Sequence, residues 1–159
     1  MEYQSSFTSP LGYLILKSDG QSITGIYFSE NSIQEQNTCE VLEKCKELLA
    51  NYFSGKTIAF EIPLHPEGTE FQQKVWNELL KIPYGETITY LELAVRLGDA
   101  KAVRAVGMAN GRNPIAILIP CHRVIGAGNK MTGYAGGTGR KKILLELEMK
   151  YNPIRRTLF

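Results

Sequence analysis

The sequence predicts an α+β protein in which a small antiparallel sheet with one helix precedes a mostly helical part. Short runs rich in β-branched and aromatic residues, separated by turn signals, fill the first third of the chain. After the stretch PLHPEG the pattern changes to apolar residues at helical spacing. The prolines and glycine of this stretch are typical of a linker, so we expect one domain at residues 1–65 and a second at residues 69–159.

The first domain is expected to be a meander of strands covered by one helix. The Asp19-Gly20 pair is a strong hairpin signal. A helix is predicted at residues 39–53, where apolar positions recur at helical spacing before Gly55. Cys45 lies among these apolar positions and is expected to be a small buried side chain. The predicted strands cover residues 3–9, 13–18, 23–29 and 57–62.

The second domain is expected to begin with a capped helix. Thr69 stands three residues before Gln72, the spacing of a capping box. The apolar residues predicted to share one face of this helix are Phe71, Val75, Leu79 and Leu80.

A helix-turn-helix pattern follows. Thr89 and Glu92 repeat the capping-box spacing, Gly98 ends that helix, and Asp99 caps the next one. Two short helices joined by a tight glycine-containing turn are typical of DNA-binding proteins, although other proteins use the same pair.

The net charge of +2 conceals an asymmetry along the chain. Residues 1–83 carry 6 Lys and Arg against 11 Asp and Glu, a balance of −5. Residues 84–159 carry 12 against 5, a balance of +7. A basic half suggests a polyanionic partner, but uneven charge also occurs in proteins without one.

The composition argues against several classes of protein. No apolar run approaches the length of a membrane span, and the amino terminus has no signal-peptide pattern. Three cysteines, an odd number at irregular spacing, indicate reduced thiols rather than a disulfide framework. We therefore expect a cytoplasmic protein, or a nuclear one in a nucleated cell. The Cys and His residues show no repeated ligand spacing, so we expect no metal site.

The stretch ILIPCHRVIG places Cys121 and His122 side by side. The preceding run at 115–119 is apolar enough to predict a buried extended segment. His122 and Arg123 are potential cations that would favour the reactive thiolate. Adjacent side chains of an extended backbone point to opposite faces, so a contact between thiol and imidazole requires a kinked turn or a bridging water.

A histidine that acts as a base needs a group to orient it. The last helix, RKKILLELEMK, offers Glu146 and Glu148. Glu146 has lysines four residues away on both sides, which is typical of an exposed row of ion pairs. Glu148 lies on the apolar stripe, four residues after Leu144, and a carboxylate on a buried face must find a partner. We expect Glu148 to orient His122.

Small residues surround Arg104 in the second helix of the helix-turn-helix pattern. Gly107 in mid-helix costs about 1 kcal/mol relative to alanine, so a close approach is expected to compensate for it. That approach is either packing against a neighbouring helix or contact with a nucleic-acid backbone. Further along, a glycine-rich loop surrounds Tyr134, which is expected on a pocket wall because the glycine spacing does not fit a phosphate-binding loop.

The stretch IPCHRVIG, together with PYGETITY, RAVGMANGRNP and GYAGG, resembles the O6-alkylguanine-DNA alkyltransferases. The resemblance runs from about Phe71 to Met149, whereas the amino-terminal third is similar only in length and expected fold. It implies a ribonuclease H-like first domain and a winged helix-turn-helix second domain.

The resemblance also implies an activity that needs no cofactor. Cys121 would attack the alkyl carbon on guanine O6, with weaker action on O4-alkylthymine. His122 would act as base through a bound water, Glu148 would orient His122, and Asn113 would support the turn. Tyr90 would push the phosphate and donate a proton toward the departing guanine. A thioether has no good leaving group, so one molecule would be consumed per lesion.

The family's other roles concern DNA and the alkylated base. Arg104 would enter the base stack from the minor groove of double-stranded DNA as the target nucleotide rotates out, and the protein is expected to be a monomer. The remaining residues implied to contact DNA are Tyr90, Ala102, Ala105, Gly107 and Arg112. Val124, Tyr134 and Ala135 would line the pocket. Ala135 departs from the serine of many relatives, which puts the tolerance of bulky adducts in doubt.

Two other classes stay open on the sequence alone. A non-catalytic module could bind damaged DNA and flag it for another pathway, but proteins of that kind replace the cysteine. A transcription regulator could use the helix-turn-helix, but no segment obviously supplies a dimer interface or a sensor domain.

Overall fold

The computed structural model describes residues 2–34, 36–56, 59–129, 134 and 136–152. The chain divides into two compact units. The first contains Met1–Glu67 and the short segment Pro114–Leu118, and the second contains Gly68–Asn113 and Ile119–Phe159. No helix among the described residues is both long enough and apolar enough to cross a membrane.

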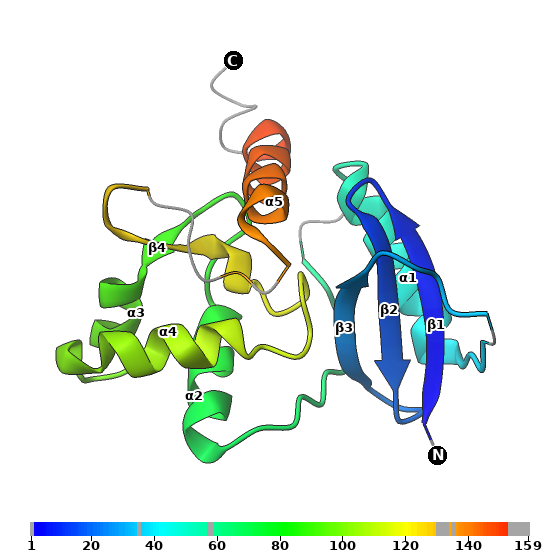
Figure 1. Ribbon diagram of the computed structural model, residues 1–159, viewed down its shortest axis with the longest axis horizontal. Coiled ribbons are helices and arrows are strands. Elements are labelled where there is room, and N and C mark those ends of the chain that lie inside the picture. Colours follow the sequence, from blue (N-terminus) through cyan, green and yellow to red (C-terminus); the bar gives the residue numbers. More distant parts are fainter. Residues whose placement is uncertain (1, 35, 57–58, 130–133, 135, 153–159) are drawn as a thin grey trace. The chain divides into compact units, whose positions relative to one another are not determined.

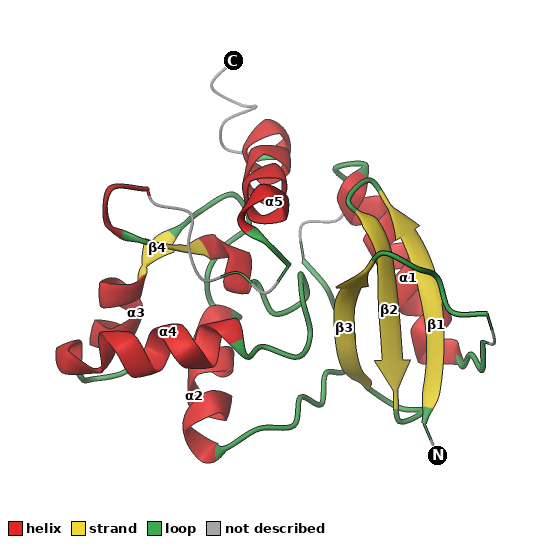
Figure 2. Ribbon diagram, viewed as in Figure 1, coloured by secondary structure: helices red, strands yellow, loops and turns green. Residues whose placement is uncertain are grey.

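The first unit contains a three-stranded antiparallel sheet (Figure 2). Its strands are β1 (Tyr3–Ser9), β2 (Gly12–Ser18) and β3 (Ile23–Ser29), in the order β1-β2-β3. In this register Leu14 of the central strand is paired with Phe7 on one side and Phe28 on the other. The three strands predicted for this part of the chain are confirmed.

Helix α1 (Glu40–Phe53) packs against this sheet (Figure 1). The helix residues that it buries recur at helical spacing and are Leu42, Cys45, Leu49 and Tyr52. Cys45 is fully buried, and burial raises the pKa of its thiol to about 12, so the thiol stays protonated. The interpretation of Cys45 as a small buried side chain is confirmed.

The strand predicted at residues 57–62 is not formed by the described part of that run. Residues 57–58 lie outside the described residues, and residues 59–62 belong to no strand. Instead Leu64 forms an isolated parallel bridge with Ile23, whose N–H donates to the carbonyl of Pro63 at 2.9 Å. The two prolines of PLHPEG have no N–H, so a longer ladder cannot form here.

The second unit is mostly helical, and the α+β class is confirmed. Its helices are α2 (Glu70–Leu79), α3 (Tyr90–Arg96), α4 (Val103–Gly111) and α5 (Thr138–Tyr151), with 3-10 turns at Ala100–Ala102, Cys121–Arg123 and Ala127–Asn129. The short strands β4 (Ile88–Thr89) and β5 (Val124–Ile125) pair in parallel. Helices α3 and α4 form the predicted helix-turn-helix, and Gly98, with φ of 90°, lies in the turn between them.

Helix α2 begins as predicted but buries a different face. The capping box of Thr69 and Gln72 is present. The buried residues are Val75, Trp76 and Leu79, whereas Phe71 and Leu80 are 40% and 48% exposed. The Trp76 indole N–H donates to the carbonyl of Ala109 in α4 at 2.8 Å. Burying the large indole and satisfying its N–H turns the helix away from the predicted face.

The apolar run at 115–119 is buried, as predicted, but it is not extended. It folds into turns in which Ile117 adopts φ of +71°. A β-branched residue in this left-handed region costs about 1–3 kcal/mol. Ile115 forms a bridge with Ile26 of β3 inside the first unit. The prediction of an extended segment was wrong because apolar composition specifies burial and not backbone conformation.

Candidate active site

Cys121 and His122 lie on a tight turn rather than on a strand. Residues Cys121–Arg123 form a 3-10 turn, and the next residue, Val124, pairs with Ile88 of β4. Cys121 is 5% exposed and His122 is fully buried. The kinked turn was one of the two arrangements that the sequence left open for this pair. It carries three consecutive functional side chains into the interior of the second unit.

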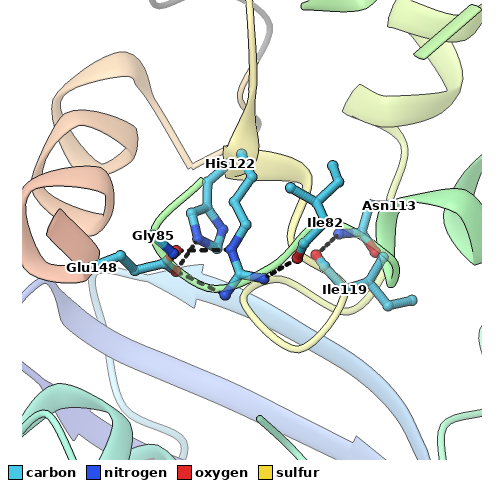
Figure 3. A network of polar contacts seen from close by, with 7 residues as sticks. Ile82, Gly85, Asn113, Ile119, His122 and Glu148 are labelled. Carbon is cyan, nitrogen blue, oxygen red and sulfur yellow. Dashed lines mark hydrogen bonds and ion pairs between the residues drawn. The ribbon is translucent and has the colours of Figure 1, made fainter. Parts of the chain in front are cut away.

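The buried carboxylate of Glu148, in α5, joins this turn to the loop between α2 and β4 (Figure 3). Its Oε2 lies 2.6 Å from His122 Nε2. Arg123 donates to both carboxylate oxygens, at 2.8 and 3.1 Å, and the Gly85 N–H donates to Oε1 at 3.1 Å. Arg123 also donates to the carbonyl of Ile82 at 2.7 Å. The structure thus brings together Glu148 and His122.

These contacts determine the protonation states of Glu148 and His122. Burial raises the pKa of Glu148, but the contacts of His122 and Arg123 outweigh burial and hold this pKa well below its usual range. Burial lowers the pKa of His122, and Glu148 only partly offsets this effect. A neutral imidazole beside a carboxylate donates its Nε2–H, which leaves Nδ1 as the acceptor. His122 Nδ1 has no hydrogen-bond partner among the described residues.

The thiol of Cys121 is neutral in this environment. Burial raises its pKa to about 11, although the Asn113 side chain and the charge of Lys141 partly lower it. Asn113 also holds the turn, because its Nδ2 donates to the carbonyl of Ile119 at 2.7 Å. The expectation that His122 and Arg123 favour the thiolate was wrong, because His122 is neutral and Arg123 pairs with the Glu148 carboxylate.

Lys141 is a site residue that the sequence interpretation missed. It is fully buried in α5, and burial lowers the pKa of its ammonium to about 8. Its Nζ donates to the Tyr90 hydroxyl at 3.5 Å, and it is the cation that acts on Cys121. A signal was available, since Lys141 precedes Leu144 by three residues and Glu148 by seven, on the same apolar stripe.

Asn110 was missed as well. It is 1% exposed, and its Nδ2 donates to the Cys121 carbonyl at 3.3 Å. The side chain therefore joins the end of α4 to the turn that carries the thiol. Its position four residues after Val106 places it on the buried face of α4, which is visible in the sequence.

The residues implied to contact DNA lie on or beside α4. Arg104, Ala105 and Arg112 are exposed, and Ala102 is half-buried. A Cβ atom on Gly107 would meet the Tyr90 ring at 3.7 Å, which is ordinary van der Waals distance. Packing of α4 against the first residue of α3 therefore accounts for part of this glycine's surroundings.

The pocket residues are described only in part. Val124 is fully buried, and Tyr134 is 9% exposed. Burial raises the pKa of Tyr134, and the nearby Cys121 raises it further. Ala135 lies outside the described residues.

Replacing Gly85 with alanine is expected to destabilise the protein and slow its chemistry. Gly85 has φ of +81°, and an added Cβ would clash with the Asn152 side chain. Relieving this clash displaces the Asn152 side chain, which donates to the Gly85 carbonyl, or the loop whose N–H donates to Glu148. The left-handed conformation alone costs an alanine about 1–2 kcal/mol, so we expect a larger loss, measured by denaturant unfolding. Gly98→Ala is the control, because φ there is +90° and nothing lies within 4 Å. Equal losses in the two variants would contradict the role of the clash.

Both units of the chain match domains of known proteins. Residues 3–66 match the ribonuclease-like domain of 6-O-methylguanine DNA methyltransferase, and residues 70–150 match its DNA-binding domain. Methylated-DNA--protein-cysteine methyltransferase of Methanosarcina acetivorans is 47% identical, over 92% of this chain and 97% of its own. The protein of the same name from Haemophilus influenzae is 46% identical, over 92% of this chain and 86% of its own.

Solved structures agree with these matches. The crystal structure of Mycobacterium tuberculosis O6-methylguanine methyltransferase is 44% identical, with a TM-score of 0.88 over 100% of this chain and 99% of the other. Mycobacterium tuberculosis OGT in complex with DNA is 46% identical, with a TM-score of 0.84 over 97% of both chains. Similarity of this extent, over both units, shows that the chain belongs to the 6-O-methylguanine DNA methyltransferase family.

Proposed function

We propose that the protein repairs O6-alkylguanine in double-stranded DNA by moving the alkyl group to Cys121, once per molecule. The observation that carries this proposal is the buried network of His122, Glu148 and Arg123, whose first and last residues directly follow Cys121 in one 3-10 turn. The names of the relatives and the DNA-bound neighbour support the same activity. Weaker action on O4-alkylthymine is part of the proposal.

The proposed step begins with removal of the thiol proton. His122 Nδ1 accepts it through a bridging water, while Nε2–H donates to Glu148 and stabilises the imidazolium that forms. The Cys121 sulfur then forms a bond to the alkyl carbon as the bond from that carbon to guanine O6 breaks. Because burial raises the thiol pKa to about 11, the thiolate exists only when this base is in place.

The guanine must receive a proton as the alkyl group leaves. Tyr90 donates it, and the Lys141 ammonium, whose Nζ lies 3.5 Å from the Tyr90 oxygen, stabilises the phenolate. Proton loss at Cys121 and proton gain by guanine then balance. The thioether offers no leaving group, so the protein is inactivated by a single turnover.

Access to the lesion requires base flipping, because guanine O6 lies at the pairing and major-groove edge of the base, where a protein in the minor groove cannot reach it within the duplex. We propose that α4 enters the minor groove, where Arg104 occupies the space of the extruded base. Ala102, Ala105 and Gly107 allow the backbone to approach, Arg112 contacts phosphate, and Val124, Tyr134 and Ala135 line the pocket. DNA binding and alkyl acceptance are both assigned to residues 69–159.

Free thiols support a reducing compartment. Cys39, Cys45 and Cys121 form no disulfide. We propose that the protein works in the cytoplasm, or in the nucleus of a nucleated cell, and as a monomer.

The test of the proposed function is intact-protein mass spectrometry after mixing with a duplex that contains one O6-methylguanine. The expected result is a gain of one methyl group, mapped to the Cys121 peptide and saturating at one equivalent of DNA. Tight binding of the lesion without a mass change would instead identify a non-catalytic module that binds damaged DNA.

Replacing Arg104 with alanine is expected to slow repair of duplex DNA by about 100-fold, because extruding a base costs a few kcal/mol without the arginine. The reaction with free O6-benzylguanine, which needs no extrusion, is expected to change less than about twofold. Single-turnover rates with both substrates check this. Equal losses with the duplex and the free base would contradict the proposed role of Arg104.

A further inference from the structure

The exposed face of α4 has an apolar side chain at its centre. Met108 is 62% exposed, more than any other large apolar side chain among the described residues. Single exposed apolar residues are common on protein surfaces, so exposure alone decides nothing. The position of Met108 among charged residues is what distinguishes it.

Helix geometry fixes this position. The helix α4, seen beside α3 in Figure 1, buries Val106, Ala109 and Asn110. Successive helical residues are about 100° apart, so Met108 points away from the side of Val106. Arg104 lies four residues before Met108 and Arg112 four residues after it, and both are exposed. One apolar side chain is thus flanked by a guanidinium one turn away on each side.

The order of side chains along this face, with an apolar one between two cationic ones, complements a nucleic-acid groove. Guanidinium groups bind the phosphates that border a groove, whereas the sugars and base edges between the phosphate rows present apolar surface. Methionine is unbranched and adapts to irregular surfaces, and apolar side chains of this kind are used by proteins that widen and bend the minor groove. Two exposed cations beside the methionine favour a polyanion over an average protein surface.

We propose that Met108 is an apolar DNA contact, seated in the groove between the space of the extruded base, which Arg104 fills, and the phosphate bound by Arg112. This proposal rests on the proposed function. The Met108 contact would contribute to DNA affinity in addition to the charged contacts. This contribution does not depend on salt concentration, because burying a thioether releases no counterions. The position is suited to holding the duplex open beside the base that Arg104 replaces.

The test measures duplex affinity as a function of salt for the wild type, Met108→Ala and Arg112→Ala. Met108→Ala is expected to weaken binding by about fivefold at every salt concentration, with an unchanged slope of log K against log salt. Arg112→Ala is expected to reduce the slope by about 0.9, the value for one lost phosphate contact. Leu80→Ala is the matched control, since Leu80 is 48% exposed but follows α2.

Reaction with free O6-benzylguanine is expected to stay unchanged in Met108→Ala, which shows an intact site. Wild-type affinity in Met108→Ala, together with the expected loss in Arg112→Ala, would overturn this proposal and leave the proposed function standing. If Met108→Ala kept the DNA affinity of the wild type but lost a self-association that the wild type shows in sedimentation, Met108 would be assigned to a contact between copies of the chain. This result would also overturn the proposal. A failure of the proposed function is separate, because it would appear as absent alkyl transfer in the wild type.

Discussion

Cys121→Ala is expected to accept no alkyl group while still binding duplex DNA. The acceptor sulfur is absent from this variant. The measurement is mass gain with an O6-methylguanine duplex, together with duplex affinity by fluorescence anisotropy. Because the Cys121 side chain is small and 5% exposed, we expect affinity within about threefold of the wild type.

The other two cysteines provide matched controls for this variant. Cys45 is buried in α1, where burial raises its thiol pKa to about 12, and Cys39 caps the same helix without a side-chain hydrogen bond. Cys39→Ala and Cys45→Ala are expected to accept one full equivalent. Alkyl transfer by Cys121→Ala would refute the assignment of the acceptor. A simultaneous loss of DNA binding would point to misfolding, which circular dichroism would detect.

Local chemistry in the sequence predicted the elements that depend on few residues. The capping box at Thr69 forms because a hydroxyl and a carboxamide three residues apart satisfy two N–H groups. The burial of Glu148 was predictable because the helical period alone puts it on the apolar stripe with Leu144. The same period also places Lys141 there, but lysine is so often exposed that its burial was not expected.

The parts that were not predicted depend on contacts between distant segments. Arg123 reaches the Ile82 carbonyl and Glu148, which lie 41 and 25 residues away. Nothing near Arg123 in the sequence indicates that its charge is directed away from Cys121. Likewise, the positive φ of Ile117 opposes the preference of a β-branched residue. Such a conformation is maintained by its surroundings, so local propensity predicts the opposite.

Glu148→Gln is expected to have the second largest effect, on both stability and rate. The amide keeps the shape of the side chain but removes the charge that compensates Arg123, which is 6% exposed. Breaking a buried ion pair by removing one partner costs about 3–5 kcal/mol, so we expect a loss of this order in the free energy of unfolding at pH 7. Glu146→Gln is the matched control in the same helix, with an expected change below about 0.5 kcal/mol because Glu146 is exposed.

The pH dependence of stability provides a second measurement. His122 has a folded pKa below its ordinary 6.5, so the unfolded state binds more protons and wild-type stability falls as pH drops below that value. Glu148 has a folded pKa below its ordinary 4.5, so a further loss begins as pH falls through that value. In Glu148→Gln this second loss is expected to shrink to the part that Asp19 and Glu43 contribute, since their folded pKa values are also lowered. Denaturant unfolding between about pH 3 and pH 8 spans both ordinary pKa values. If the free energy of unfolding of the variant fell with pH below 4.5 as steeply as that of the wild type, the assignment of the second loss to Glu148 would be contradicted.

The rate of transfer distinguishes orientation of His122 from simple support of the fold. Without the carboxylate, the imidazolium that forms during proton removal is less stable, so we expect transfer to slow by more than about tenfold. The loss of the anion also lowers the pKa of His122 further, so the acid limb of the pH–rate profile moves to lower pH even as the maximum falls. A purely structural role would reduce the amount of active protein and leave that limb in place. Single-turnover transfer to O6-benzylguanine, measured across pH on folded protein, therefore separates the two roles, and an unshifted limb would refute the orienting role of Glu148.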